Sequence, residues 1–313
     1  MAAVRLAATG RPMSDGGCRL YGLELAPLTL DEAVELADDA VVTRTRLLIG
    51  VLNAAKVVKL SQDRVLRDSL LEADVLLADG QSIVWASRLL RRPLPERVAG
   101  IDLFEALLGL ADRHRLRVYL LGARPDVLSA VEETIHRRWP AAQVVGSRDG
   151  YFAEEESSDV AADIVRSRAD LLFLGMTTPK KEVFLGTYGH LLGVPVMHGV
   201  GGSFDILAGI TRRAPEAWQR AGMEWAYRVL QEPGRLWQRY LTTNAAFLGM
   251  SAAELVHRRM PYPRPCDTVT PVPASTPNAP SWMAMTWRAG EGGFSSASSV
   301  SSGSSHKVPV AGT

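Results

Sequence analysis

The sequence is poor in cysteine, in long apolar runs and in any excess of one charge. Its two cysteines, Cys18 and Cys266, lie in loop-like sequence near opposite ends of 313 residues. They offer neither a disulfide framework nor a CxxC metal pair, so a reducing cytoplasm is the simplest compartment. No apolar run approaches the roughly 18 residues that cross a bilayer, and no signal peptide is recognised. Lys and Arg (35) balance Asp and Glu (34), which gives no overall field for nucleic acid.

The motifs of several common enzyme classes are also missing. The chain has no GxxxxGK[ST] phosphate loop, no HExxH among its six histidines, no GxSxG and no Asp-x-Asp, which argues against P-loop, zinc-protease and serine-hydrolase chemistry. The segment GVGGSF places Phe204 where a dinucleotide fingerprint has its last glycine, so a Rossmann-type oxidoreductase is a weak alternative. His198, beside an apolar run, is expected to pack in the core.

The chain is predicted to have two ordered parts between two polar tails. Residues 1–18 show no sustained period, and residues 262–313 are rich in Pro, Ser, Thr and Gly, a composition typical of disorder. With 47% hydrophobic residues, the rest can bury one large core or two modest ones. We predict an α/β domain over residues 19–215 and a helical C-terminal appendage over residues 216–261.

Short apolar runs alternate with amphipathic helical patterns through most of the first part. Each run has the length of a strand and is bounded by Gly, Asp or Asn. Such runs are typical of parallel strands that are buried on both faces and joined by crossover helices. The predicted fold class is therefore α/β, a Rossmann-like, mostly parallel sheet flanked by helices, with a helical C-terminal appendage and disordered tails. The predicted strands are 46–53, 73–79, 117–123, 142–150, 169–176 and 195–202.

Short polar, glycine-rich segments follow the predicted strands. Open parallel sheets bind ligands beyond the carboxyl ends of their strands, so a site is expected there. Any one segment could be ordinary turn chemistry, because Gly, Asp and Asn dominate strand ends for backbone reasons, but their joint placement favours a site. The segments are Asn53, Asp79-Gly80, Gly122, Asp149-Gly150-Tyr151, 177–182 and 199–205.

A single carboxylate, Asp79, ends the buried run ADVLLAD. Glycines in the neighbouring segments let phosphate oxygens approach backbone N–H groups, and helix N-termini favour negative charge. These features suit a substrate that carries a diphosphate. If the diphosphate is a leaving group, the carboxylate can take a proton from an incoming hydroxyl, which is the logic of an inverting group transfer.

Six sequence blocks occur in the order and spacing of one known family. They are LLADGQSIVWASRLLRRPLPERVAGIDLFEALL, VYLLGARPDV, WPAAQVVGSRDGYF, ADLLFLGMTTPKKEVFL, HGVGGSFDILAGITRRAP and MEWAYRVLQEPGRLWQRYL. By these blocks the chain resembles the WecG/TagA/CpsF family, glycosyltransferase family 26, over roughly residues 20–245. No single block is specific, but six blocks in order are hard to obtain from turn chemistry alone.

The resemblance implies an inverting hexosyltransferase or N-acetylhexosaminyltransferase of the EC 2.4.1 type, with residues 19–215 as its catalytic domain. It implies a UDP-sugar donor and a polyprenyl-diphosphate-linked acceptor, in the synthesis of teichoic acid, exopolysaccharide or another cell-surface polysaccharide. The protein would be cytoplasmic and peripherally associated with the inner face of the plasma membrane, with a homo-oligomer left open and no nucleic-acid partner. The missing Asp-x-Asp predicts that it needs no metal cofactor.

The resemblance also assigns roles to individual residues. Asp79 matches an Asp-Gly motif whose carboxylate is the expected general base. Arg97 matches an arginine expected to meet substrate or phosphate charge, although it could equally be a surface arginine beside a loop. Tyr151, as a uracil contact or as half-buried filler, and Asp205 match positions near the nucleotide. The expected substrate-binding set is Asn53, Arg97, Gly122, Tyr151, Lys181, Glu182, Gly201 and Asp205.

Two positions depart from the family pattern. Val51-Leu52-Asn53 stands where the family commonly has Thr-x-Asn, and Pro179-Lys180-Lys181-Glu182 stands where it usually has Pro-x-Gln-Glu. Lysine cannot accept a hydrogen bond, but it is a sensible point charge near a diphosphate. The departures leave open a second hypothesis, a catalytically silent sugar-nucleotide-binding or assembly subunit. Retention of Asp79 argues against it.

The appendage is expected to fold over the site. Arg228, Arg235 and Arg239 are spaced by seven and four residues, which places them on one helical stripe, although Pro233 interrupts the helix. They are expected to reach the lipid diphosphate or the departing UDP, beside aromatic residues suited to a membrane interface. The alternative is a helical pair packed by its tryptophans, with solvated arginines.

Overall fold

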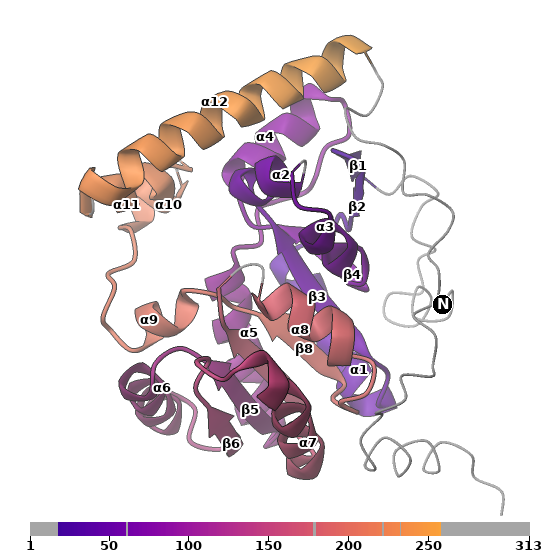
Figure 1. Cartoon of the computed structure of the whole chain (residues 1–313), viewed down its shortest axis with the longest axis vertical. Helices are drawn as coiled ribbons and strands as arrows, with labels where there is room; N and C mark the ends of the chain where they lie inside the picture. The colour runs from indigo at the N-terminus through magenta and orange to yellow at the C-terminus, as the bar shows by residue number, and fades with distance from the viewer. Residues whose placement is uncertain (1–17, 61, 178–179, 221, 232, 258–313) are drawn as a thin grey trace, which may run out of the picture. The chain divides into compact units, whose positions relative to one another are not determined.

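A six-stranded parallel sheet forms the centre of the protein (Figure 1). The computed structural model describes residues 18–60, 62–177, 180–220, 222–231 and 233–257. The strand order is β4-β3-β8-β7-β5-β6, and every neighbouring pair is parallel. The six predicted strands and the α/β fold class are confirmed. The strands are β3 (Leu47–Leu52), β4 (Val75–Ala78), β5 (Arg117–Gly122), β6 (Gln143–Arg148), β7 (Leu171–Gly175) and β8 (Val196–Gly199).

A short antiparallel hairpin precedes the sheet and was not predicted. It consists of β1 (Cys18–Leu20) and β2 (Leu23–Leu25). Its two turn residues, Tyr21 and Gly22, both have positive φ angles, 50° and 81°, as a tight hairpin turn requires. The expectation that Cys18 lies in a loop is therefore wrong. Its side chain is buried, and its thiol donates to the carbonyl of Arg92 at 3.0 Å.

Twelve α-helices lie in the described ranges, and local sequence explains where several of them begin. Thr29 and Glu32 form a capping box at the start of α1, Asp63 caps α3 and Pro125 opens α6, each a preferred helix start. The helices are α1 (Leu30–Thr43), α2 (Ala54–Leu60), α3 (Arg64–Leu71), α4 (Gln81–Leu89), α5 (Gly100–His114), α6 (Pro125–Arg138), α7 (Ser157–Ser167), α8 (Lys180–Tyr188), α9 (Ser203–Leu207), α10 (Glu216–Arg220), α11 (Glu224–Gln231) and α12 (Pro233–His257).

Helices cover both faces of the sheet. On one face, α1, α5 and α6 pack on a cluster that includes Ile49, Leu120 and Phe173. On the other face, α2, α3 and α4 share a second cluster with Leu52 and Leu76, and α8 lies against α3. Because both faces are buried, the strands read as continuous apolar runs. The carboxyl ends of the six parallel strands all lie along one edge of the sheet.

The C-terminal helices pack on the α/β domain. The predicted helix break at Pro233-Gly234 is confirmed, since α11 ends at Gln231 and α12 begins at Pro233. α12 lies alongside α2 (Figure 1), and its Phe247 belongs to the same buried cluster as the hairpin. Glu254 accepts a hydrogen bond from the backbone of Tyr21 at 3.1 Å. The predicted domain limits at residues 215 and 261 stay predictions. Residues 1–17 and 258–313, and with them the predicted tails, lie outside the described residues.

Candidate functional site at the carboxyl edge of the sheet

Asp79 is held in one orientation by hydrogen bonds from two directions. The parallel register pairs Leu52 with Ala78, so the residues that follow, Asn53 and Asp79, lie side by side. The Asn53 side-chain amide donates to Asp79 Oδ2 at 3.2 Å, and the backbone N–H of Gly100, at the start of α5, donates to Oδ1 at 2.9 Å. The carboxylate is therefore fixed at the sheet edge by an amide and a helix N-terminus.

Two lysines and a glutamate form a buried cluster beside Asp79. The Lys56 ammonium donates to the carbonyl of Val51 at 2.8 Å and lies 3.0 Å from Glu182 Oε1. The Lys181 ammonium lies 3.9 Å from the same carboxylate oxygen. All three residues are less than a tenth exposed. A buried charge is costly unless it is paired, and the Glu182 carboxylate is the anionic partner of both lysines.

Burial changes the titration of this cluster. Burial lowers the pKa of Lys181 from 10.5 to about 8, helped by repulsion from Lys56 and opposed by Glu182 and Asp79. Burial works to raise the pKa of Glu182, but attraction to Lys56 and Lys181 outweighs it and the net pKa is lowered. A lysine poised near neutral pH is uncommon and is typical of functional sites.

His198 on β8 is fully buried next to this cluster. Its Nδ1 lies 3.1 Å from the carbonyl oxygen of Ile49, and its Nε2 lies 3.4 Å from that of Gly100. Burial lowers its pKa from 6.5 to about 4, against the opposing effect of the two carbonyls, with Lys181 and Lys56 lowering it further. The ring is therefore neutral at pH 7, and the prediction that His198 is a packed core residue is confirmed.

Glycines line the middle of the edge because no side chain fits there. Gly122 has φ +131°, and a Cβ on it would lie 2.5 Å from the backbone of Gly175. A Cβ on Gly175 would in turn lie 2.2 Å from the ring of Phe204. The backbones of Gly122 and Gly175 therefore contact each other where β5 and β7 end. This packing requires glycine at position 122, whether or not Gly122 also contacts a ligand.

Tyr151 stands at the far end of the same edge and is 73% exposed. It lines a recess of about 470 Å³ with Arg124, Pro125, Asp126 and Asp149, where α6 begins. The half-buried alternative for Tyr151 is therefore wrong, because its ring projects into solvent. An exposed aromatic ring beside an open recess can stack on a planar ligand.

Lys180 fixes the loop that carries Tyr151. Its ammonium donates to the carbonyls of Gly150 and Phe152, both at 2.9 Å, and lies 4.0 Å from the centre of the Phe152 ring. The neighbouring lysine, Lys181, points instead toward the cluster of Glu182. The two consecutive lysines therefore have different partners, Lys180 in the loop of Tyr151 and Lys181 in the cluster beside Asp79.

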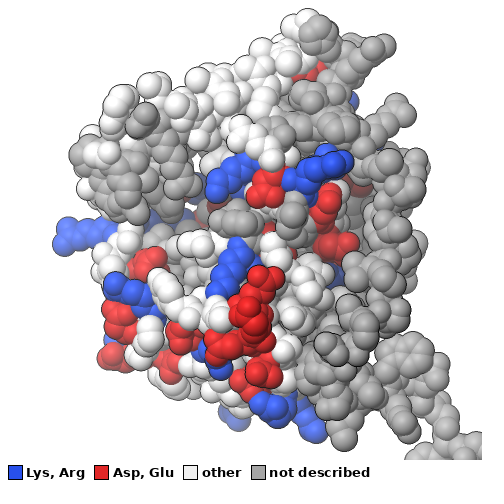
Figure 2. Space-filling model, viewed as in Figure 1, with Lys and Arg blue, Asp and Glu red and all other residues white. Residues whose placement is uncertain are grey.

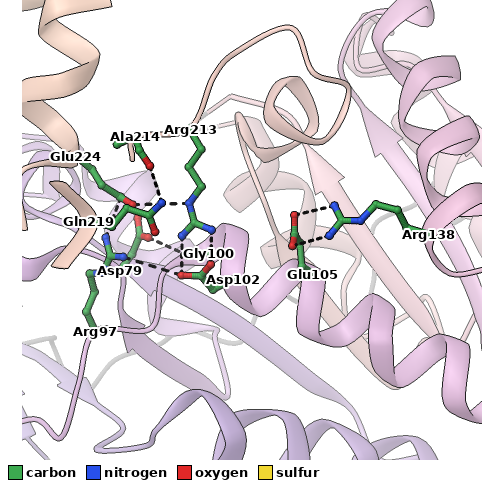
Figure 3. A network of polar contacts seen from close by, with 10 residues as sticks. All are labelled: Asp79, Arg97, Gly100, Asp102, Glu105, Arg138, Arg213, Ala214, Gln219 and Glu224. Carbon is green, nitrogen blue, oxygen red and sulfur yellow. Dashed lines mark hydrogen bonds and ion pairs between the residues drawn. The ribbon is translucent and has the colours of Figure 1, made fainter. Parts of the chain in front are cut away.

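Arg97 does not stand free at the edge, since it takes part in a network of four charged side chains (Figure 3). Its guanidinium donates to Glu224 at 2.8 Å and lies 4.0 Å from Asp102. Arg213 donates to Asp102 at 2.7 Å and lies 3.8 Å from Glu224. Glu224 opens α11 and Asp102 lies in the first turn of α5, so the network fastens the appendage next to Asp79.

The appendage also touches the helix that follows Asp79. Gly222 has φ +69°, and a Cβ on it would lie 2.5 Å from the side chain of Gln81 and 3.2 Å from that of Trp85. Both residues belong to α4, which starts two residues after Asp79. The chain before α11 therefore passes directly over α4, as expected of a segment that folds toward the site.

The other expected site residues lie after β8 and in the helices α9, α11 and α12. Gly201, with φ +55°, follows β8 and lies against Lys181, while Asp205 lies within α9. Arg228 lies in α11, and Arg235 and Arg239 lie in α12, but their side chains are outside the described part of the structure. The shared stripe of these three arginines stays a prediction.

Sequence reasoning missed Lys56 and the partners of Arg97. Lys56 stands in the apolar segment NAAKVVKL, and a lone lysine on an apolar helix face is a usable signal for a buried charge. Asp102, Arg213 and Glu224 gave no local signal, because each is one of many charged residues and only the fold brings them together.

No group of three or more His, Cys, Asp or Glu side chains is placed to hold a metal ion among the described residues. Independence from metal stays a prediction. Likewise, none of the helices that the structure describes is long and apolar enough to cross a membrane.

A parallel sheet with an oriented carboxylate, buried cations and glycine-lined loops along its carboxyl edge places the protein among the α/β proteins that bind their ligands at that edge. Residues 18–261 match the glycosyl transferase WecG/TagA/CpsF family, and the chain belongs to this family.

Proposed function

We propose that the protein is an inverting glycosyltransferase that moves a hexose or N-acetylhexosamine from a UDP-sugar to a polyprenyl-diphosphate-linked saccharide. The acceptor would be an intermediate of cell-surface polysaccharide or teichoic-acid-type synthesis. Family membership supports glycosyl transfer. The observation that carries the mechanism is the Asp79 carboxylate, fixed at the sheet edge by Asn53 and Gly100.

Asp79 would act as the general base. The acceptor hydroxyl oxygen attacks the anomeric carbon, the bond from that carbon to the phosphate oxygen breaks, and the hydroxyl proton passes to Asp79. Attack opposite the leaving group inverts the anomeric centre. A positioned base contributes about 10²–10⁴ in rate, and the two hydrogen bonds to Asp79 would supply that positioning.

The donor's uracil would bind at the recess of Tyr151. An exposed ring, held on a loop by Lys180, offers a stacking surface, and the start of α6 offers backbone N–H groups to an anion. The rest of the donor would extend from this recess along the carboxyl edge toward Asp79. The expected roles of Gly201, Glu182 and Asp205 in donor binding are part of this proposal.

Membrane association would use the exposed side of α12. Trp237, Leu241, Leu248 and Leu255 are all exposed, and their spacings of four and seven residues place them on one helical stripe. Figure 2 shows little charge along the described surface of α12, whereas charges of both signs are interspersed below it. An apolar stripe of this kind suits insertion into one leaflet.

The test is transfer from a panel of labelled UDP-sugars to lipid-linked acceptors in native membranes, with EDTA present. Asp79→Asn is expected to lower transfer by about 10²–10⁴ while UDP binding persists. Asp68→Asn, which removes an exposed carboxylate on α3, is the matched control and is expected to leave transfer unchanged.

Each alternative has its own result. UDP binding without transfer by the unsubstituted protein would favour the silent sugar-nucleotide-binding subunit. Transfer that EDTA abolishes would overturn metal independence, and transfer that survives Asp79→Asn would remove Asp79 from the role of base.

A further inference from the structure

Lys181 is a buried cation without a close partner of its own. Its side chain is only 8% exposed. Within the described residues its ammonium donates no hydrogen bond. It lies 3.9 Å from Glu182 Oε1, an oxygen that Lys56 already contacts at 3.0 Å. Burying an ammonium in this way is costly, so the position needs an explanation.

Two glycines make room for the Lys181 side chain. A Cβ on Gly199 would lie 3.1 Å from Lys181 Cδ and 3.2 Å from Cε, and a Cβ on Gly201 would lie 3.1 Å from Nζ. The stem of the lysine therefore lies across the end of β8, and its ammonium reaches the turn that follows. This places the charge at the carboxyl edge, where ligands of parallel sheets bind.

Lys181 lies between the proposed uracil recess and Asp79. In the order β4-β3-β8-β7-β5-β6, β8 is two strands from β4, which precedes Asp79, and three strands from β6, which precedes Tyr151. Neighbouring strands are about 4.8 Å apart, so the ammonium stands at an intermediate distance from both. The diphosphate of a nucleoside-diphosphate sugar is likewise the part between the base and the sugar.

The positive and negative side chains around Lys181 balance before the reaction, but not after Asp79 takes a proton. Lys56 and Lys181 face Glu182 and Asp79, and the neighbouring His198 is neutral, so two positive charges meet two negative charges. When Asp79 takes the acceptor's proton, one negative charge disappears and the cluster carries an excess positive charge. At that moment the leaving diphosphate gains a negative charge.

We propose that Lys181 binds the donor diphosphate and stabilises the negative charge that develops on it as it leaves. This inference rests on the proposed function and names a residue for it. As the anomeric carbon–oxygen bond breaks, its electron pair stays on the β-phosphate oxygen, and the Lys181 ammonium donates a hydrogen bond to that diphosphate. The proton of the acceptor goes to Asp79, so Lys181 transfers none.

The first test measures binding of UDP and of uridine by calorimetry. Lys181→Gln is expected to weaken UDP binding at least tenfold and to leave uridine binding unchanged, because only UDP carries the diphosphate. Lys59→Gln removes an exposed lysine from α2 and is the matched control. Equal UDP affinity in Lys181→Gln and the unsubstituted protein would overturn the inference.

The second test needs no substitution. UDP affinity of the unsubstituted protein is expected to fall as pH rises above about 8, where the free Lys181 ammonium loses its proton, while uridine affinity follows a separate course. In transfer assays, Lys181→Gln is expected to lower kcat by about 10²–10³. An unchanged UDP affinity between pH 7 and 9 would contradict the role of Lys181.

Other outcomes are also decisive. If Lys181→Gln weakened binding of a UDP-hexuronate but not of UDP or a UDP-hexose, the lysine would recognise a sugar carboxylate and the diphosphate role would be wrong. If the unsubstituted protein bound no UDP, the proposed donor would fail, and this inference with it. Equal UDP binding by both proteins would refute the role of Lys181 alone.

Discussion

At the scale of single residues, His198 makes the stability of the protein sensitive to acid. Its folded-state pKa of about 4 lies below the ordinary 6.5, so between these values the unfolded chain binds a proton that the folded chain does not. Lowering the pH through this window therefore favours unfolding. We expect a loss of roughly 2 kcal/mol in the free energy of unfolding between pH 7 and pH 5 from this group.

The measurement is urea unfolding at pH 7 and pH 5. His198→Gln is expected to be less stable at pH 7, because it replaces a buried, packed ring, but to lose this part of the pH dependence. His136, exposed on α6, gives the matched control His136→Gln. If His198→Gln kept the full pH dependence of the unsubstituted protein, His198 would not be the group responsible.

The two departures from the family pattern occupy different environments. Val51 is buried on β3, and its Cγ2 would lie 3.9 Å from a Cβ on Gly100, so it packs beneath the residue that orients Asp79. A hydroxyl is not needed for that contact. Lys181 instead brings a charge to the sheet edge. The sequence identified both positions as departures. Only the structure shows that Val51 has a packing role and that Lys181 places a charge at the site.

At the scale of elements, the ion-pair network that joins α5 to α11 should hold the appendage in place. Arg97 and Glu224 are both mostly buried and 2.8 Å apart, and a hydrogen bond between such charged groups contributes about 1.5–3 kcal/mol. Glu224→Gln is expected to cost an amount of this order. Amide hydrogens of residues 224–231 should then exchange faster, as measured by mass spectrometry.

Glu216→Gln is the control for this prediction. Glu216 pairs with Arg220 on α10 at 2.7 Å, but both side chains are about four-fifths exposed, and such surface pairs contribute little. Its substitution should change exchange in α11 hardly at all. Equal exchange in Glu224→Gln and the unsubstituted protein would show that the network does not fasten α11.

The strands of the sheet could be predicted from sequence, whereas the hairpin could not. Six apolar runs, such as 46–53, have the length and composition that parallel strands buried on both faces require. The strands β1 and β2 have three residues each, which is too short for a periodic signal. The hairpin is stabilised by contacts with α12, including the bond between Tyr21 and Glu254, and these join distant parts of the chain.

Part of the candidate site could also be predicted from sequence, because some of its residues directly follow predicted strands. Asn53 and Asp79 each follow a predicted strand, so their meeting at one edge follows from a parallel sheet. Lys56 lies within a helix and reaches the edge only through its long side chain. The capture of Arg97 by Glu224 joins residues 127 positions apart, and no local pattern encodes such a pair.

At the scale of the whole molecule, membrane binding and transfer should reside in the part of the chain that matches the family. Leu241→Ser with Leu248→Ser should weaken sedimentation with anionic vesicles at least tenfold, because burying an exposed leucine side chain in the bilayer contributes about 1.5–3 kcal/mol. Removal of everything after Pro261 is the control and should preserve both vesicle binding and transfer.

Two results would contradict this prediction. Vesicle binding that survives the double leucine substitution would exclude the α12 stripe as the membrane contact. A large loss of transfer on removal of residues 262–313 would show that the polar C-terminal segment contributes to activity.

The sequence alone determined the α/β class, the alternation of strands and helices, and the residues that follow each strand, because hydrophobic periodicity and turn chemistry are local properties. The tertiary structure decided which of those residues act together. It set Asp79 between Asn53 and Gly100, turned Lys181 across Gly199, and paired Arg97 with the appendage. These contacts depend on strand order and on helices packing across the sheet, and both arise from burial of the whole chain.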